Sequence, residues 1–160
     1  MKIKGKVWRF GNDIDTDLII PAKYLVTTDA KELGLHCLEG LKKDFPSEVK
    51  SGDIIVGGKN FGSGSSREHA PLAIKGAGIA AVIAPSFARI FYRNSINIGL
   101  PIIESPSVGK FKDRDIIEID FLAGNISNLT TGENLSFQSY PQFLQRIIQA
   151  GGLMKWAKKI

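Results

Sequence analysis

Apolar and polar residues alternate in some segments of the chain and form unbroken apolar runs in others. Residues 2–10 alternate, which predicts a strand. Residues 53–56, 79–84 and 100–104 are short, almost wholly apolar runs, typical of strands covered on both faces. Stretches with helix signals separate them: residues 30–41 after Asp29, residues 66–76, and residues 87–98 after Ser86. This alternation of strand and helix predicts right-handed crossovers and a parallel sheet.

The pattern changes after Pro106. Residues 116–121 alternate between apolar and acidic side chains, residues 128–132 form a turn signal, and residues 135–137 resemble a further strand. This part predicts antiparallel β structure, and Pro141 then opens a final helix. We therefore expect an α/β fold with a mixed sheet that is parallel in its middle part. We also expect residues 1–160 to form a single domain, because no linker or internal repeat divides them.

Composition narrows the class of protein. Hydrophobic residues make up 43% of the 160 positions, enough to bury a core, so disorder as the dominant state is excluded. The apolar runs are too short to span a bilayer, and the basic start is not followed by a signal-peptide core, so we expect a cytoplasmic protein without a membrane partner. The single cysteine, Cys37, excludes an internal disulfide and any site built from several thiolates of this chain.

Net charge is +5, from 21 basic and 16 acidic residues. The basic side chains are scattered and are not interleaved with aromatic residues that stack on bases, so we expect a solvated surface and no nucleic-acid partner. RNA binding stays as the alternative from a different functional class. Arg89 and Arg93 lie one helical turn apart, and we expect structural or interface roles for both.

A glycine- and serine-rich loop at residues 57–69 is the most informative stretch. It lacks the Gly-Lys-Ser/Thr end of a Walker loop, the third glycine of a dinucleotide fingerprint and the Gly-x-Ser-x-Gly of a hydrolase elbow. One hypothesis is a capping box, with Ser65 at the helix cap and Glu68 three positions on. The other is a site for a carboxylate or phosphate, because Arg67 at a helix N-terminus is unfavourable without an anion.

Three stretches of sequence resemble one family. They read DIDTDLIIP (13–21), NFGSGSSREHA (60–70) and SFARIF (86–91). Together they resemble the swivelling domain of the aconitase superfamily, and most of all the small-subunit family of 3-isopropylmalate dehydratase. Ser63 departs from the many relatives that carry cysteine there. The resemblance implies a three-layer β/β/α domain and a hydro-lyase that interconverts 2-isopropylmalate and 3-isopropylmalate through isopropylmaleate in leucine biosynthesis. It also implies a large partner subunit that carries a [4Fe–4S] cluster, with no cofactor or metal in this chain.

The same resemblance implies residue roles. Ser65 would be the base that removes the carbon-bound proton, and Arg67 would bind a carboxylate of a dicarboxylic hydroxy acid, with Ser66 in support. Thr16 and Asp17 match a Thr-Asp pair near the site, and Asp17 would act catalytically by orienting a partner residue. Local sequence leaves open a second role, an Asx turn made by Asp13, Asp15 or Asp17.

Val26 lies where relatives acting on tricarboxylic substrates, such as homoaconitases, look to carry an arginine. A valine would instead offer an apolar wall to an isopropyl group, so isopropylmalate is the expected substrate. Homoaconitase, citraconate dehydratase and 2,3-dimethylmalate dehydratase stay as alternatives. The substrates of the last two are also dicarboxylic and apolar at that end.

Overall fold

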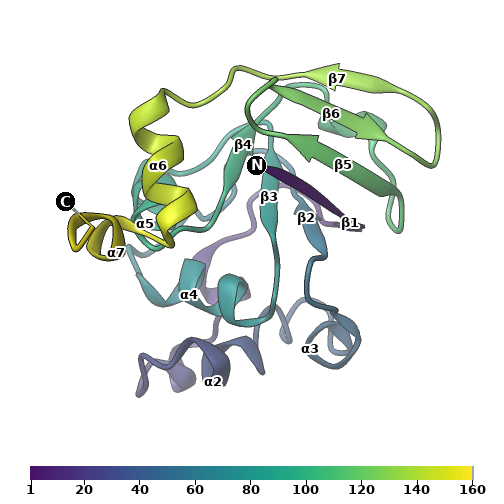
Figure 1. Cartoon of the computed structure of the whole chain (residues 1–160). Coiled ribbons are helices and arrows are strands. Elements are labelled where there is room, and N and C mark those ends of the chain that lie inside the picture. Colours follow the sequence, from purple (N-terminus) through teal and green to yellow (C-terminus); the bar gives the residue numbers. More distant parts are fainter. Residues whose placement is uncertain (160) are drawn as a thin grey trace.

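Seven strands form one mixed sheet in the order β4-β3-β2-β1-β5-β6-β7. The structure is a computed structural model and describes residues 1–159 (Figure 1). Strands β1 to β4 pair in parallel, whereas β5, β6 and β7 extend the sheet from β1 in antiparallel pairs. The predicted mixed sheet with a parallel middle is therefore confirmed. The strands are β1 (Lys2–Arg9), β2 (Ile54–Val56), β3 (Ala81–Ala84), β4 (Ile102–Glu104), β5 (Ile116–Asp120), β6 (Asn125–Asn128) and β7 (Asn134–Ser136).

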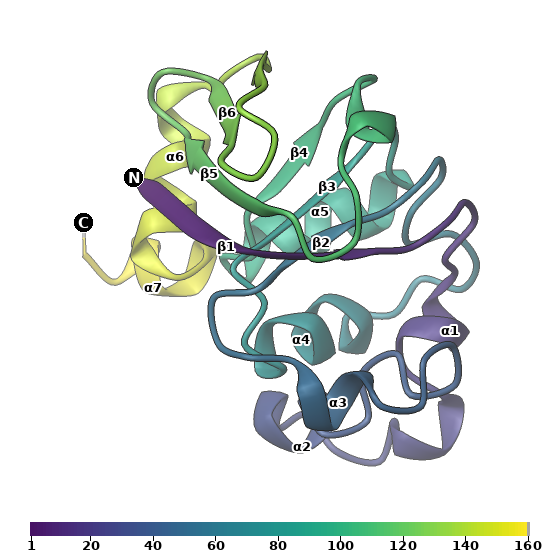
Figure 2. The same ribbon diagram turned by 90° about the vertical axis from the view of Figure 1, so that its right-hand side faces the viewer.

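Strand β1 belongs to both halves of the sheet. Its first residues, Lys2 to Lys6, pair with β5, and its last residues, Val7 to Arg9, pair with β2. Figure 2 shows β1 running beneath β5 and continuing toward β2. Gly5 lies where the two pairings meet, and a Cβ atom there would stand 2.0 Å from the carbonyl oxygen of Gly52. The absence of a side chain at Gly5 thus permits the close approach of backbone that joins the halves.

Burial along the strands follows the layers. Every residue of β2 and β3 is buried, whereas buried and partly exposed positions alternate along β5. The reason is visible in Figure 2, where helices α1 to α4 cover the lower side of the parallel strands and the antiparallel strands rise above the other side. A strand with both faces covered has an unbroken apolar sequence, and a strand with one wet face alternates. The observed arrangement agrees with the expected three-layer fold.

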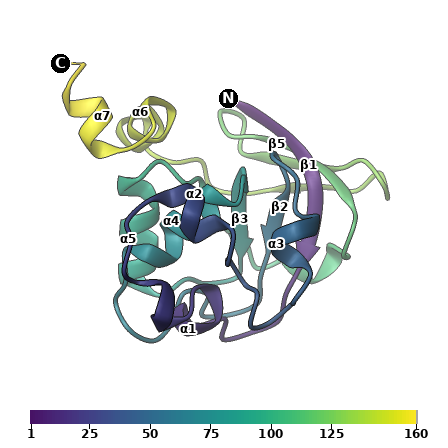
Figure 3. The same cartoon turned by 90° about the horizontal axis from the view of Figure 1, so that it is seen from below.

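Most of the helices are short. Seen from below, α2 and α4 lie beside each other in front of the sheet, with α5 at one side (Figure 3). Among residues 1–159, none of the helices is long and apolar enough to cross a membrane. The helices are α1 (Thr16–Ile19), α2 (Ala30–Gly34), α3 (Phe45–Glu48), α4 (His69–Gly76), α5 (Arg89–Asn97), α6 (Gln142–Ala150) and α7 (Leu153–Ala157), with 3-10 turns at Ala22–Tyr24 and Val108–Lys110.

Three predicted helix boundaries are wrong. The helix expected over residues 30–41 ends at Gly34, and Leu38 beyond it has a φ of 57°, which no right-handed helix accepts. The helix expected from residue 66 begins at His69, because Pro71 fits only in the first turn. The helix expected from residue 87 begins at Arg89, and Ser86 does not cap it: its hydroxyl accepts a hydrogen bond from the Asn60 N–H at 2.8 Å. Helices α1, α3 and α7 and strand β6 were not predicted.

Candidate active site

The three sequence stretches that carry the family resemblance meet at one edge of the sheet. Residues 13–17 follow β1, residues 57–68 follow β2, and residues 85–89 follow β3. These three strands are parallel neighbours, so the segments that leave their carboxyl ends emerge side by side. Crevices at this edge of a parallel sheet are the usual place for ligands.

Backbone hydrogen bonds join the three segments into a short ladder. The Gly62 N–H donates to the Ile14 carbonyl at 2.8 Å, and the Thr16 N–H donates to the Ser63 carbonyl at 2.9 Å. On the other side, the Ala88 N–H donates to the Phe61 carbonyl at 2.9 Å. The serine-rich loop is therefore the middle member of the ladder and is held from both sides.

Gly62 shows why the loop needs glycine. Its φ is +83°, and a Cβ atom there would lie 2.2 Å from the ring of Phe91. A side chain at this position would both strain the backbone and push Phe91 away. The glycine thus lets the loop bend closely over the first turn of α5.

A cavity of about 270 Å³ opens beside this ladder. Four of the six predicted site residues line it, namely Thr16, Ser65, Ser66 and Arg67. A volume of this size lies just below the range of about 300–1,000 Å³ typical of ligand pockets, which suits a small metabolite. The remaining lining residues are Gly62, Gly64, Ala88, Arg89, Ile90 and Phe91.

Two residues of the segment after β1 hold the serine loop in place. The buried Thr16 hydroxyl donates to the Ser65 carbonyl oxygen at 2.9 Å. Asp17 forms an ion pair with Arg67, whose side chain is only 18% exposed against 66% for Asp17. Asp15 takes the Asx role that the sequence left open, because its carboxylate accepts from the Leu18 N–H and caps α1. Asp17 contacts Arg67 of this chain, and its predicted role of orienting a residue of the partner stays a prediction.

The side chains of Ser65 and Ser66 are exposed and not used as helix caps. The capping-box hypothesis is wrong, because Glu68 is the cap residue of α4 and makes no side-chain cap hydrogen bond. Within the described part of the chain, neither serine hydroxyl makes a hydrogen bond, although the Ser65 carbonyl does. Both hydroxyls are therefore available to a ligand in the cavity.

Val26 lies apart from these residues. It is 92% exposed and lines a different cavity, of about 290 Å³, together with Tyr24 and His36. The Tyr24 and His36 rings stack at 3.8 Å, and His36 Nδ1 lies 3.2 Å from a carboxylate oxygen of Glu39. Burial alone would raise the pKa of Glu39, but hydrogen bonds from Tyr24 and His36 outweigh it and lower that pKa. These contacts of Tyr24 with His36 and Glu39 hold the segment before Val26 in place. The predicted contact of Val26 with substrate stays a prediction.

Arg89 is the residue that reasoning from sequence missed. It was expected to be a structural or interface charge, yet it lines the cavity with Ser65 and Arg67. Arg93, one turn further along α5, does not. A signal was present in the sequence, because Arg89 closely follows the carboxyl end of a predicted buried strand.

The residues of this chain do not fit an iron–sulfur cluster. A [4Fe–4S] cluster is held by several cysteine thiolates, and Cys37 is the single cysteine. Its side chain is fully buried, and burial raises the pKa of the thiol, which opposes the thiolate form that binds metal. Residues 1–159 also contain no group of three or more His, Cys, Asp or Glu side chains placed to hold a metal ion.

The segments around the cavity are part of a known protein family. The family model of the aconitase C-terminal domain matches residues 13–107, the span that holds all three segments around the cavity. The 3-isopropylmalate dehydratase small subunit of Thermodesulfovibrio yellowstonii is 58% identical over 160 residues, covering 99% of this chain and 95% of that protein. This chain belongs to the family of 3-isopropylmalate dehydratase small subunits. The predicted class of enzyme, a hydro-lyase of the aconitase superfamily, is confirmed.

Other members of the small-subunit family agree in sequence and in fold. The isopropylmalate/citramalate isomerase small subunit of Methanocaldococcus jannaschii is 59% identical over 158 residues, covering 98% of this chain and 94% of that protein. A crystal structure of 3-isopropylmalate dehydratase from the same organism superposes with a TM-score of 0.95 at 50% identity, covering 99% of this chain and 95% of that one. The fold described above is therefore the fold of the family.

Proposed function

We propose that this chain is the small subunit of the enzyme that interconverts 2-isopropylmalate and 3-isopropylmalate through isopropylmaleate in leucine biosynthesis. The observation that carries the proposal is a single cavity that brings two unbonded serine hydroxyls, Ser65 and Ser66, beside the guanidinium of Arg67. A dehydration needs a group that removes a proton from carbon, and a carboxylate on the neighbouring carbon needs a cation to hold it.

Ser65 is the proposed base. Ser65 takes the carbon-bound proton in its deprotonated form, the alkoxide, which becomes a hydroxyl as the substrate carbon loses the proton. The surroundings must therefore stabilise negative charge on Oγ before the transfer. Thr16 fixes the position of the residue through the Ser65 carbonyl, which leaves the hydroxyl pointing free of internal bonds. The helix start lies four residues away, at His69, so the two guanidinium groups that line the cavity and the partner subunit, rather than the end of α4, supply the positive field.

Arg67 is the proposed carboxylate-binding residue. A guanidinium offers two parallel N–H donors that match the two oxygens of a carboxylate, which an ammonium group does not. The ion pair with Asp17 holds the largely buried side chain of Arg67 in position before substrate arrives. Asp17 thus acts through Arg67, and Ser66 adds a hydroxyl to the same cavity.

A large partner subunit completes the enzyme in this proposal. The relatives are named small subunits, which implies a large subunit beside them. Any iron–sulfur cluster of the complex is then ligated by the large subunit, because this chain has one buried cysteine.

Reconstitution tests the proposal. The chain alone is expected to be inactive, and the chain combined with its large subunit is expected to interconvert the two isopropylmalates, with isopropylmaleate detectable by ultraviolet absorbance. A complex of the large subunit with the Ser65→Ala chain serves as the matched control. Turnover by the isolated small chain would contradict the two-subunit proposal.

A second candidate substrate has a specific observation in its favour. The Methanocaldococcus jannaschii relative is named for both isopropylmalate and citramalate, and both acids carry an alkyl group where a tricarboxylic acid carries a carboxylate. Val26 is 92% exposed. The residues that line its cavity include Glu32 and His36 but no arginine or lysine. We therefore propose acceptance of citramalate beside isopropylmalate, and exclusion of homoaconitate.

Val26→Arg distinguishes these substrates. If Val26 faces the variable group once the partner is bound, an arginine weakens isopropylmalate binding and favours a substrate with a carboxylate there. We expect the ratio of the two kcat/KM values to change by about 10-fold or more. The folded chain should be unaffected, because the side chain is 92% exposed. An unchanged ratio would show that Val26 does not contact substrate.

A further inference from the structure

Arg89 is a second guanidinium at the cavity that holds Ser65 and Arg67. It is the first residue of α5 and is exposed. The backbone before it is fixed, because Phe87 pairs with Phe61 and the Ala88 N–H donates to the Phe61 carbonyl. The position of Arg89 relative to the serine loop is therefore set by the same ladder that builds the cavity.

The charges around the cavity are unequal. Arg67 is paired with Asp17, so together these two side chains are close to neutral. Arg89 forms no ion pair with any acidic side chain in residues 1–159. The uncompensated positive charge that this chain presents to the cavity therefore resides on Arg89, and it favours an anion there.

A dicarboxylic substrate has two carboxylates, and Arg67 can hold one of them. We infer that Arg89 binds the other carboxylate of the substrate, as a second guanidinium in the same cavity as Arg67. The inference rests on the proposed function for the identity of the ligand. Ile90 lies next to Arg89, lines the same cavity and is 49% exposed, so the proposed clamp adjoins an apolar surface suited to an alkyl group.

Arg93 provides the matched control. It lies one turn after Arg89 on α5 and is also exposed. With Arg89 it borders a separate hollow that contains Glu104, and Arg93 does not reach the cavity of Ser65. A general loss of positive charge from α5 would affect both arginines equally, whereas a substrate clamp affects Arg89 alone.

The experiment compares Arg89→Gln, Arg89→Lys and Arg93→Gln in complexes reconstituted with the large subunit. We expect Arg89→Gln to raise KM by about 10- to 100-fold, the range for loss of a hydrogen-bonded charge pair. Arg89→Lys should recover part of this loss, since the charge returns without the bidentate geometry. Arg93→Gln should leave KM within about 2-fold of the wild type, and subunit affinity measured by sedimentation should be equal for all three.

A half-ester of isopropylmalate locates the contact. If Arg89 holds one carboxylate, the half-ester that blocks this carboxylate no longer contacts Arg89. Its inhibition constants for wild type and Arg89→Gln should then differ by less than about 3-fold. Equal KM values for Arg89→Gln and Arg93→Gln, or a KM rise explained by weaker subunit affinity, would overturn the inference.

If the wild-type complex does not turn over isopropylmalate, the proposed function is wrong, and a test without turnover is needed for Arg89. Calorimetry with maleate then decides on Arg89 alone: tighter binding to wild type than to Arg89→Gln supports it, and equal or no binding overturns it.

Discussion

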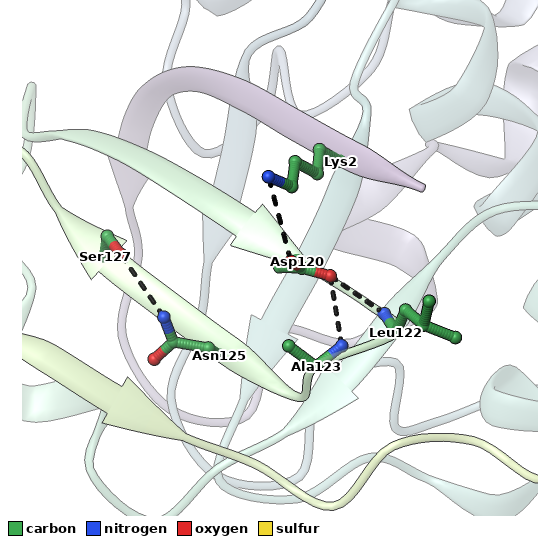
Figure 4. A network of polar contacts seen from close by, with 6 residues as sticks. All are labelled: Lys2, Asp120, Leu122, Ala123, Asn125 and Ser127. Carbon is green, nitrogen blue, oxygen red and sulfur yellow. Dashed lines mark hydrogen bonds and ion pairs between the residues drawn. The ribbon is translucent and has the colours of Figure 1, made fainter.

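The antiparallel and parallel halves of the sheet use their polar side chains differently. In the antiparallel half, Asp120 at the end of β5 accepts hydrogen bonds from the Leu122 and Ala123 N–H groups and lies 4.0 Å from the Lys2 ammonium (Figure 4). Asn125 donates to the Ser127 hydroxyl in the same network. Asp120 thus closes the turn after β5 and faces Lys2 on the adjacent strand β1, whereas Asn125 bonds along its own strand, β6.

At the carboxyl ends of β1, β2 and β3 the polar side chains face a cavity instead. Among the described residues, the hydroxyls of Ser65 and Ser66 have no hydrogen-bond partner, and Arg89 has no ion pair. Antiparallel strands are joined by tight turns that close on themselves, whereas parallel strands send long connections outward from one edge. Polar side chains without internal partners therefore gather at the parallel edge, which makes it the place to look for ligand binding and catalysis.

Replacing a serine in each half tests this contrast most strongly. Ser65→Ala removes the proposed base and should lower kcat of the reconstituted enzyme by about 10²- to 10⁴-fold, the usual contribution of a positioned acid or base. Its melting temperature should not change, because the hydroxyl makes no internal bond. Ser127→Ala in the antiparallel half is the control, and its kcat should match the wild type. Normal turnover by Ser65→Ala would remove Ser65 from the mechanism.

An aspartate from each half gives a second, smaller contrast. Asp17→Asn weakens the ion pair that orients Arg67, so kcat/KM should fall by about 10-fold, mostly through KM, with little loss of stability. Asp120→Ala removes the acceptor of two backbone N–H groups and should lower the free energy of unfolding by about 1–2 kcal/mol, with kcat/KM unchanged. Steady-state kinetics beside urea unfolding measures both. A stability loss in Asp17→Asn equal to that in Asp120→Ala would contradict the distinction.

Tyr140 connects the two halves of the sheet. We expect it to make the free energy of unfolding depend on pH at the alkaline end. It follows β7, is buried, and its hydroxyl oxygen accepts from the Ile102 N–H of β4 at 2.8 Å. Burial raises the pKa of Tyr140 above its usual value of about 10. Above that pH the unfolded chain loses the proton while the folded chain keeps it, so stability is full below about pH 10 and falls as pH rises, by about 1.4 kcal/mol per unit.

Tyr140→Phe should flatten this alkaline decline while lowering stability at neutral pH, because the Ile102 N–H then lacks its partner. Urea unfolding from pH 7 to pH 11 measures both quantities. Tyr24→Phe is the comparison, since the pKa of Tyr24 is also raised, first by its hydrogen bond with Glu39 and only then by burial. Identical slopes for wild type and Tyr140→Phe would show that Tyr140 does not sense pH in this way.

Some errors of prediction had their signal in the sequence and others did not. The capping pattern at Ser65 and Glu68 suggested a helix from residue 66, but Pro71 in the interior of such a helix would lack an N–H and clash with a preceding carbonyl. Pro71 was therefore sufficient to place the start near His69. The start of α5 at Arg89 had no such signal, because residues 86–88 are held extended by contacts with the loop around Phe61.

The sequence by itself determined where six of the seven strands lie along the chain and the change from parallel to antiparallel pairing, because these depend on local periodicity. Ser65 and Arg67 were picked out by the resemblance of their motif to a known family. Only the tertiary structure decided which side chains meet. Thr16 and Ser65 are 49 positions apart, Asp17 and Arg67 are 50 positions apart, and Arg89 joins them from a third segment. Such meetings follow from the pairing of β1, β2 and β3, which brings three loops to one edge. Local sequence has no means of specifying distances across that edge.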